Sequence, residues 1–273
     1  MAKDNLIISF EGIGSSGKTT QAAMLAGSFW SKYNTAVHKM INRKMLQTTL
    51  KPFSHKPAEK LWVAQLPQVE EGTDMLVYMA LMKQRYAEIL EELGDRPHIV
   101  LLGRYIDSVF AHAATRIVLN AIAAKRRSAS SGPEFLAKLI YTDSQREELQ
   151  FEPLVDKIIG AELKACNKKI ETLYAAFSGL RNAVRWPDMT IVLDVPVSKM
   201  SEREARRENR AFTQGDVLYF TITSHAYRFL KKKEPKRIYL VDGYREREAI
   251  AKEIFGLVTK KFNLSAYRKK AKR

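Results

Sequence analysis

The sequence contains a single cysteine, Cys166, among its 273 residues. One cysteine excludes a disulfide framework within the chain and a metal cluster held by thiolates, and such sparing use suits a reducing compartment. Histidine is scarce as well, with five residues and no motif such as H-E-x-x-H. We therefore expect no bound transition metal. We interpret Cys166, which lies in a segment with helical character, as a structural residue.

Long apolar runs are missing too. Nothing in the sequence approaches the roughly 18 consecutive apolar residues of a membrane span. The apolar run at residues 6–10 is too short for the apolar part of a signal peptide, and Glu11 ends it at once. These absences predict a cytoplasmic protein without a membrane partner.

Acidic residues are few compared with basic ones. Lysine and arginine total 46 against 30 for aspartate and glutamate, which gives a formal net charge of +16. Such an excess attracts nucleic acid, and it equally suits an enzyme whose substrates are all polyphosphates. Hydrophobic residues make up 45% of the chain, enough for a buried core in one large α/β domain or in one domain plus an insertion.

Short apolar segments alternate with long helical ones. Helices are predicted at residues 18–30 and 73–93, where apolar residues recur at helical spacing. Methionines 75, 79 and 82 share one face of the second helix and are interpreted as core packing. Strands are predicted at residues 6–10, 36–41, 98–102, 190–193 and 237–241. This order predicts a three-layer α/β sandwich, with a parallel sheet of about five strands and helices on both faces.

Residues 12–19, GIGSSGKT, match the P-loop pattern G-x-x-x-x-G-K-[ST], between a predicted strand and a predicted helix. Its glycines let the backbone N–H groups curl toward phosphate oxygens, and the helix presents its positive end to the same anion. Lys18 is expected on the β- and γ-phosphates of ATP, with Thr19 as a ligand of Mg²⁺. The predicted ATP-binding residues are Gly12, Ile13, Gly14, Ser15, Ser16, Gly17, Lys18, Thr19 and Thr20. The fold class is thus a P-loop NTPase, with ATP as phosphoryl donor and Mg²⁺ as cofactor.

Three segments together resemble the thymidylate kinase family of nucleoside monophosphate kinases. Residues 8–21 match that family's opening, GRYIDS at 103–108 is similar to its DRYIDS motif, and PDMTIVLDVP at 187–196 is similar to its strand entry and exit. The resemblance covers about residues 3–110 and 186–260. It implies transfer of the γ-phosphoryl group from Mg·ATP to dTMP, and it also implies a homodimer, which is common in the family.

The resemblance assigns roles residue by residue. Glu11 would lie near the acceptor nucleotide, and Arg104 would clamp the acceptor's phosphate with its two-pronged guanidinium. Tyr105 and Tyr78 would shape the nucleoside pocket. The lid would include residues 202–210 and would supply the catalytic arginine that the P-loop lacks. The candidates are Arg206, Arg207 and Arg210, although their alternation with glutamates is equally typical of a solvated helix face.

The sequence departs from the family at several positions. Gly103 stands where an aspartate is expected, and residues 42–45, NRKM, occupy the place of the family's TREPGG segment. The arginine that reads the thymine base falls at Met82 or Lys83, so Lys83 is a candidate substrate-binding residue. Additional residues also separate Ser108 from Pro187. Two alternatives therefore stay open: a kinase of another nucleoside monophosphate or nucleoside, and an ATP-binding regulator or nucleic-acid-binding protein without transferase activity.

The predicted organisation is a single P-loop kinase domain at residues 1–262. It carries a helical insertion at about 111–186, opened by an exposed loop at 125–133, and a lid at about 198–215. Residues 263–273 form a basic C-terminal tail, which we expect to be frayed. We interpret the tail as solubilising, with contact to RNA or DNA as the alternative. The expected partners are nucleotide substrates.

Overall fold

The computed structural model describes residues 5–39, 73–128, 151–208 and 214–269. Its sheet consists of five parallel strands in the order β2-β3-β1-β4-β5. The strands are β1 Leu6–Glu11, β2 Thr35–Lys39, β3 Ile99–Gly103, β4 Met189–Asp194 and β5 Ile238–Asp242. All five predicted strands are therefore confirmed, with ends that shift by at most one residue where both can be compared.

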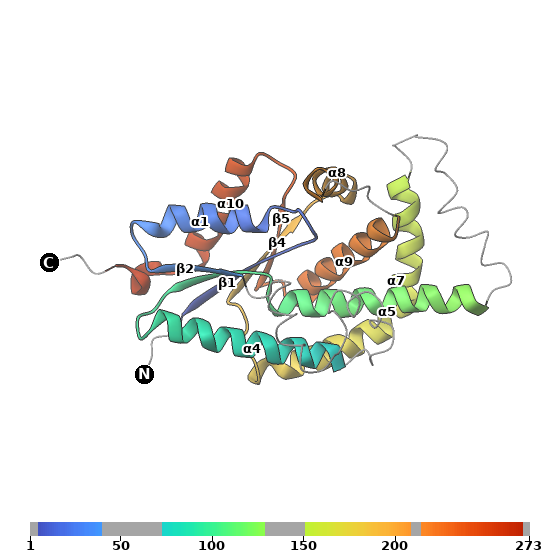
Figure 1. Ribbon diagram of the computed structural model, residues 1–273, viewed down its shortest axis with the longest axis horizontal. Coiled ribbons are helices and arrows are strands. Elements are labelled where there is room, and N and C mark those ends of the chain that lie inside the picture. The colour runs from blue at the N-terminus through green and yellow to red at the C-terminus, as the bar shows by residue number, and fades with distance from the viewer. Residues whose placement is uncertain (1–4, 40–72, 129–150, 209–213, 270–273) are drawn as a thin grey trace.

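Long helices connect the strands (Figure 1). They are α1 Lys18–Trp30, α4 Thr73–Leu93, α5 Ile106–Ser128, α7 Phe151–Gly179, α8 Val197–Glu208, α9 Gln214–Lys233 and α10 Arg247–Lys261, with 3-10 turns η2 Leu180–Asn182 and η3 Leu264–Tyr267. The two helices predicted from periodicity, at 18–30 and 73–93, have the predicted bounds. In the described residues, none of these helices has the length and apolar character needed to cross a membrane.

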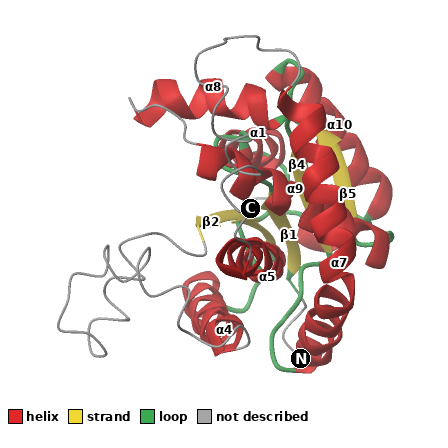
Figure 2. Cartoon of the chain, turned by 90° about the vertical axis from the view of Figure 1, so that its right-hand side faces the viewer, coloured by secondary structure: helices red, strands yellow, loops and turns green. Residues whose placement is uncertain are grey.

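The strands bury alternate side chains on opposite faces of the sheet, as the two-residue period of a strand requires. In β1, Ile7 joins a buried cluster with α4, α5, α7 and α9, whereas Ile8 and Phe10 join a second cluster with α1 and α10. Figures 1 and 2 show α1 and α5 on opposite sides of the sheet. This arrangement confirms the predicted three-layer α/β sandwich with helices on both faces.

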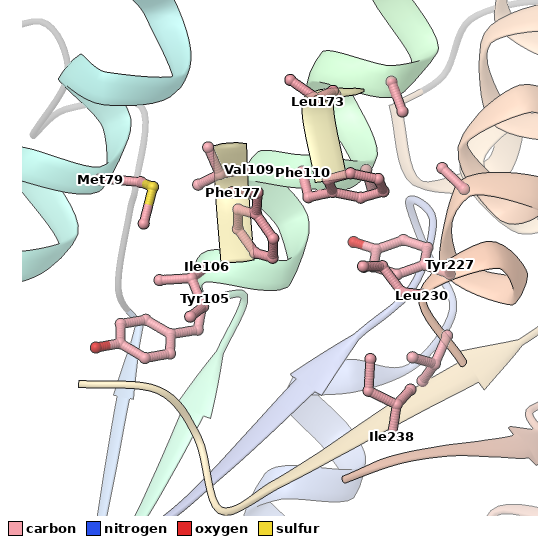
Figure 3. Close-up of a cluster of buried hydrophobic side chains, with 14 of the residues drawn as sticks. Met79, Tyr105, Ile106, Val109, Phe110, Leu173, Phe177, Tyr227, Leu230 and Ile238 are labelled. Carbon is pink, nitrogen blue, oxygen red and sulfur yellow. The ribbon is translucent and has the colours of Figure 1, made fainter. Parts of the chain in front are cut away.

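The larger cluster is rich in aromatic rings (Figure 3). The ring of Phe110 in α5 lies 5.3 Å from that of Phe177 in α7 and 5.8 Å from that of Phe229 in α9. Met79 and Met82 are buried in the same cluster, which confirms their interpretation as core residues, and so is Cys166. Helix α7, from the segment interpreted as an insertion, therefore shares one core with the sheet.

The structure corrects the loop predicted at residues 125–133, because α5 continues through Ser128. Alanine and arginine are strong helix formers, and the stretch that ends this helix is made largely of them. Basic side chains in a last helical turn are also stabilised by the negative end of the helix dipole. Residues 129–133 lie outside the described residues.

The prediction of a frayed tail is wrong for residues 263–269. Leu264 is buried in the cluster beneath α1 and α10, and the backbone N–H of Ser265 donates to the Asn263 side chain at 3.1 Å. The N–H of Asn34 donates to the carbonyl of Tyr267 at 2.8 Å, and the N–H of Lys269 donates to that of Lys32 at 3.0 Å. The burial of one leucine and several backbone hydrogen bonds therefore hold this segment in place. Its charge alone would predict a solvated segment.

Candidate functional site

The P-loop lies at the carboxyl end of β1, where its backbone turns sharply. Gly12, Ser15 and Gly17 have positive φ angles of 128°, 45° and 93°. A Cβ atom on Gly12 would stand 2.7 Å from the carbonyl oxygen of Leu193, so a side chain there would clash as well as strain the backbone. Glycine at this position lets the loop lie directly against the end of β4.

The ammonium group of Lys18 lies across this loop. Its Nζ donates to the carbonyl oxygens of Gly12 at 3.0 Å and Ile13 at 2.6 Å, and to Oγ of Ser16 at 3.1 Å. Helix α1 begins at the same lysine, with no side-chain cap and no acidic residue in its first turn. Backbone N–H groups and a positive charge therefore face the same place, which is the donor set that a polyphosphate requires.

The remaining predicted ATP-binding residues differ in their exposure. Thr19 and Thr20 are exposed on the first turn of α1, whereas Ile13 and Ser16 are buried and hold the loop. Thr19 is the one predicted metal ligand, and position 103 at the end of β3 has no carboxylate. Mg²⁺ would thus be held by Thr19, with phosphate oxygens and water as its further ligands.

Among the described residues, no group of three or more His, Cys, Asp or Glu side chains is arranged to hold a metal ion by itself. The two carboxylates nearest the ends of β1 and β3, Glu11 and Asp107, are fully buried. Both are hydrogen-bonded inside the protein. Neither carboxylate is therefore exposed to a metal ion at this edge of the sheet.

Arg104 directly follows β3 and lies next to the P-loop in the sheet, because β3 pairs with β1. Its φ angle is 64°, in the left-handed region that is costly for a residue with a side chain. Its N–H donates to the carbonyl of Phe10 at 3.0 Å, and its side chain is exposed. The turn thus presents the guanidinium outward at the same edge as Lys18.

Glu11 holds this turn from below. One carboxyl oxygen accepts a hydrogen bond from the N–H of Tyr105 at 2.6 Å, and the other accepts one from the hydroxyl of Ser108. The hydroxyl of Tyr227 donates to the same oxygen at 3.3 Å. Glu11 was predicted to lie near the acceptor nucleotide. That role stays a prediction; in the structure its carboxyl oxygens accept hydrogen bonds from protein donors, one of them the backbone N–H that follows Arg104.

The pKa of Glu11 is raised from 4.5 to about 8, chiefly by burial and secondly by the neighbouring carboxylate of Asp107. The hydrogen bonds from Ser108 and Tyr105 and the charge of Lys18 act in the opposite direction. At neutral pH the folded protein therefore retains a proton on Glu11 that the unfolded chain has lost.

This proton predicts how stability depends on pH. Because the pKa of Glu11 is higher in the folded protein, its contribution is complete below pH 4.5 and is lost as the pH rises from there through about 8. We expect the Tm of the wild type to fall between pH 6.5 and pH 8.0, and Glu11→Gln to remove most of that fall. Glutamine has no titrating proton, its amide oxygen can accept from the N–H of Tyr105, and its NH2 group can donate to the hydroxyl oxygen of Ser108. Differential scanning fluorimetry measures both.

The exposed Glu91 provides the control, and Glu91→Gln should retain the wild-type fall. A Glu11→Gln protein whose Tm falls between pH 6.5 and pH 8.0 as steeply as that of the wild type would contradict this account of Glu11.

His112 and Tyr219 belong to the same edge, although the sequence analysis did not single them out. Nδ1 of His112 in α5 lies 2.6 Å from the hydroxyl of Tyr219 in α9, and the two rings are stacked. The pKa of His112 is lowered to about 3, chiefly by burial and secondly by the positive charges of Arg104 and Lys18. The imidazole is thus neutral. Its place one helical turn after Ser108 was the signal available in the sequence.

The residues predicted to shape the nucleoside pocket and to read the base differ in exposure. Tyr105 has no exposed surface, and its hydroxyl donates to the carbonyl of Arg185 at 2.6 Å, so a contact between its ring and a ligand would require the core to open (Figure 3). Of the two positions considered for reading the base, Met82 is buried and Lys83 is exposed. Tyr78 lies in α4, but its side chain is outside the described residues.

The predicted lid is helical at both ends, in α8 and at the start of α9. Arg206 and Arg207 lie in α8, with side chains outside the described residues, and Arg210 falls outside them altogether, as do residues 42–45. Their assigned roles stay predictions. The structure thus brings Lys18 and Arg104 to one edge with His112, and places Tyr105 in the core.

The fold resembles that of a solved protein. The structure of thymidylate kinase from Ehrlichia chaffeensis matches this chain with a TM-score of 0.51 and 16% sequence identity, over 93% of this chain and 98% of that one. No protein-family model matches the sequence, and no curated protein matches it either. At this identity the similarity shows the fold alone, a parallel α/β sandwich shared with that kinase.

Proposed function

We propose that the protein transfers the γ-phosphoryl group of ATP to a nucleoside monophosphate, with dTMP as the leading acceptor. The observation that carries the proposal is the juxtaposition of Lys18 and Arg104. The first lies across a P-loop and the second projects from the neighbouring strand at the same edge of the sheet. One cation suits the donor's phosphates, and the other suits the phosphate of an acceptor.

Phosphoryl transfer requires positioning and charge neutralisation more than it requires covalent chemistry. Lys18 and the N–H groups of the loop would neutralise the charge on the donor's phosphates. Arg104 would bind two oxygens of the acceptor phosphate and align it for in-line attack. A lid arginine, Arg206, Arg207 or Arg210, would approach the transferred group. When bound, Mg²⁺ would offset the charge shared by the β- and γ-phosphates.

The acceptor's nucleoside would lie beside the neutral pair of His112 and Tyr219. The two residues offer hydrogen-bonding groups without charge, next to Arg104. Such groups suit a sugar hydroxyl or the edge of a base better than they suit a phosphate. Met82 is buried and Lys83 is exposed, so Lys83 is the candidate for contact with the base in place of the expected arginine.

The first experiment measures ADP release from Mg·ATP with each common ribo- and deoxynucleoside monophosphate as acceptor. Turnover selective for dTMP supports the full proposal, and turnover on another monophosphate retains the reaction and reassigns the acceptor. Failure of every acceptor to stimulate ADP release, with ATP still bound, would overturn the transfer reaction. It would favour the alternative function, an ATP-binding protein without transferase activity, which the replacement of the family's aspartate by Gly103 also suggests.

Arg104→Gln tests the acceptor clamp. We expect kcat/KM for the monophosphate to fall about 100-fold, because two charge-assisted hydrogen bonds are lost, while the Kd for a fluorescent ATP analogue stays within about twofold. Arg96→Gln, at an exposed arginine before β3, is the matched control and should be unchanged in both. Equal losses in acceptor and ATP binding for Arg104→Gln would show that this arginine does not serve the acceptor.

A further inference from the structure

The chain crosses the amino edge of the sheet after α10, on the side opposite the P-loop. At one end, Nζ of Lys261 donates to the carbonyl of Asp188, just before β4, at 3.1 Å and to that of Lys236, just before β5, at 2.7 Å. At the other end, Lys269 pairs through its backbone with Lys32, just before β2. The segment from α10 to the C-terminal residues therefore contacts the chain before β4 and β5 at one side of the sheet and the chain before β2 at the other.

Basic residues line this path, and we call them the amino-edge belt. They come from the C-terminal segment and from the chain just before β2, β3 and β5. The members are Lys32, Arg96, Lys231, Lys236, Lys260, Lys261, Arg268 and Lys269. Two acidic residues at the same edge pair with arginines outside the belt: Asp188 pairs with Arg185, and Glu234 pairs with Arg181 and Arg237. A third, Asp95, is exposed beside Arg96. Within the described residues, no carboxylate forms an ion pair with a member of the belt.

Two of the lysines are held in place by oxygen atoms that carry no full charge. Lys231 donates to the carbonyls of Pro235 at 2.9 Å and Ile238 at 2.7 Å, much as Lys261 does to its own two carbonyls. Both ammonium groups also lie over the ring of Tyr239, at 5.1 and 5.0 Å from its centre. Carbonyl oxygens and a ring face position these charges without neutralising them, so a phosphate would find them already ordered.

An exposed aromatic ring stands at the other end of the belt. The side chain of Trp30 is 64% exposed, the most of any large hydrophobic residue described, and Nζ of Lys269 lies 4.7 Å above its ring. An indole beside a cation is a platform on which an unpaired base can stack. A single exposed tryptophan flanked by charge is too small an apolar surface to bind by burial alone.

We propose that the amino-edge belt binds single-stranded nucleic acid, with the phosphates along the lysines and a base on Trp30. The length of the belt favours a polymer, because five strands at a spacing of about 4.8 Å span roughly 19 Å, several times the separation of neighbouring phosphates. The unpaired base that Trp30 would accept favours a single strand over a duplex. An anionic membrane is less favoured, since the described part of the belt exposes no large hydrophobic side chain besides Trp30.

The test uses a fluorescein-labelled 20-nucleotide RNA of mixed sequence, followed by anisotropy at several KCl concentrations. Lys236→Gln/Lys260→Gln/Lys269→Gln removes three charges from the belt. Lys164→Gln/Lys168→Gln/Lys252→Gln removes three from exposed positions on α7 and α10. We expect the belt variant to bind at least about tenfold more weakly at 100 mM KCl, with its salt dependence reduced by about 2 in log–log slope, and the control to change less than about twofold.

Trp30→Ala distinguishes stacking from charge. It should weaken binding to the single strand about tenfold and leave binding to a 20-base-pair duplex nearly unchanged, and the quenching of tryptophan emission by RNA should diminish. Lys18→Ala should bind RNA as the wild type does, so a failure of phosphoryl transfer and a failure of this inference are separate results.

Equal losses in the two triple variants would overturn the belt as a site and leave attraction by net charge alone. An unchanged Kd for RNA in the belt variant would also overturn it.

Sedimentation with vesicles of phosphatidylcholine and phosphatidylserine at 7:3 tests a membrane surface as the alternative ligand. Belt-dependent binding to these vesicles, without binding to RNA at the same ionic strength, would replace nucleic acid with a membrane surface.

Discussion

Lys18→Ala is expected to lower kcat for ADP formation at least about 1000-fold, which corresponds to roughly 4 kcal/mol of transition-state stabilisation. The ammonium of Lys18 is held over the loop by the carbonyls of Gly12 and Ile13. It is therefore in place before a nucleotide arrives. Alanine would leave the backbone donors of the loop intact and remove the charge that they surround.

The measurement is a coupled assay of ADP release with the best acceptor, together with titration of a fluorescent ATP analogue. Lys32→Ala, at an exposed lysine beyond the other end of α1, is the matched control and should keep full activity. The Tm of Lys18→Ala should stay near that of the wild type, because alanine is a strong helix former at a helix start. Activity close to the wild type in Lys18→Ala would exclude the P-loop as the catalytic centre.

The parts of the fold that the sequence predicted best depend on local chemistry. The bounds of α1 and α4 follow from apolar residues at helical spacing and from the glycine turn before Lys18. The strands follow from short apolar runs, since a parallel strand covered on both faces has no polar side. These elements can be predicted without knowing which distant residues are in contact, and the structure confirms them.

The site residues depend on tertiary structure, and prediction was weaker there. Arg104 and Tyr105 are neighbours in sequence, but the left-handed turn at Arg104 sends one side chain outward and the other into the core. The turn is set by Glu11, which is distant in sequence. His112 and Tyr219 meet only because α5 packs against α9. A family motif identifies such residues without telling which of them face a ligand.

Charge also misled the sequence analysis in one place. The C-terminal segment was interpreted as frayed because its lysines and arginines are typical of a solvated tail. Its order depends instead on the burial of Leu264 and on hydrogen bonds to the chain before β2. A single apolar residue hardly changes the composition of a basic segment, yet the burial of this one helps to order the segment.

Asp107→Ala is expected to destabilise the protein by about 3–5 kcal/mol. The carboxylate of Asp107 has no exposed surface and accepts hydrogen bonds from Arg237 at 2.7 and 2.8 Å and from Thr190 at 2.7 Å. Thr190 in turn is 2.9 Å from the hydroxyl of Ser9. Alanine would leave the buried guanidinium of Arg237 without its bidentate partner, and the ion pair that remains, with Glu234 at 3.5 Å, is longer and shared with Arg181. That incompletely compensated charge, rather than the lost hydrogen bonds alone, gives the effect its size.

Urea unfolding followed by circular dichroism measures the loss, and the double variant Asp107→Ala/Arg237→Met identifies its cause. Removing both charges should recover a large part of the stability, because no unpaired ion then remains inside. Asp95→Ala, at an exposed aspartate, should change the free energy of unfolding by less than about 0.5 kcal/mol. A double variant as unstable as Asp107→Ala would show that the loss of stability comes from lost packing.

Because Asp107 is next to Ser108, whose hydroxyl donates to Glu11, the single variant should also loosen the turn that presents Arg104.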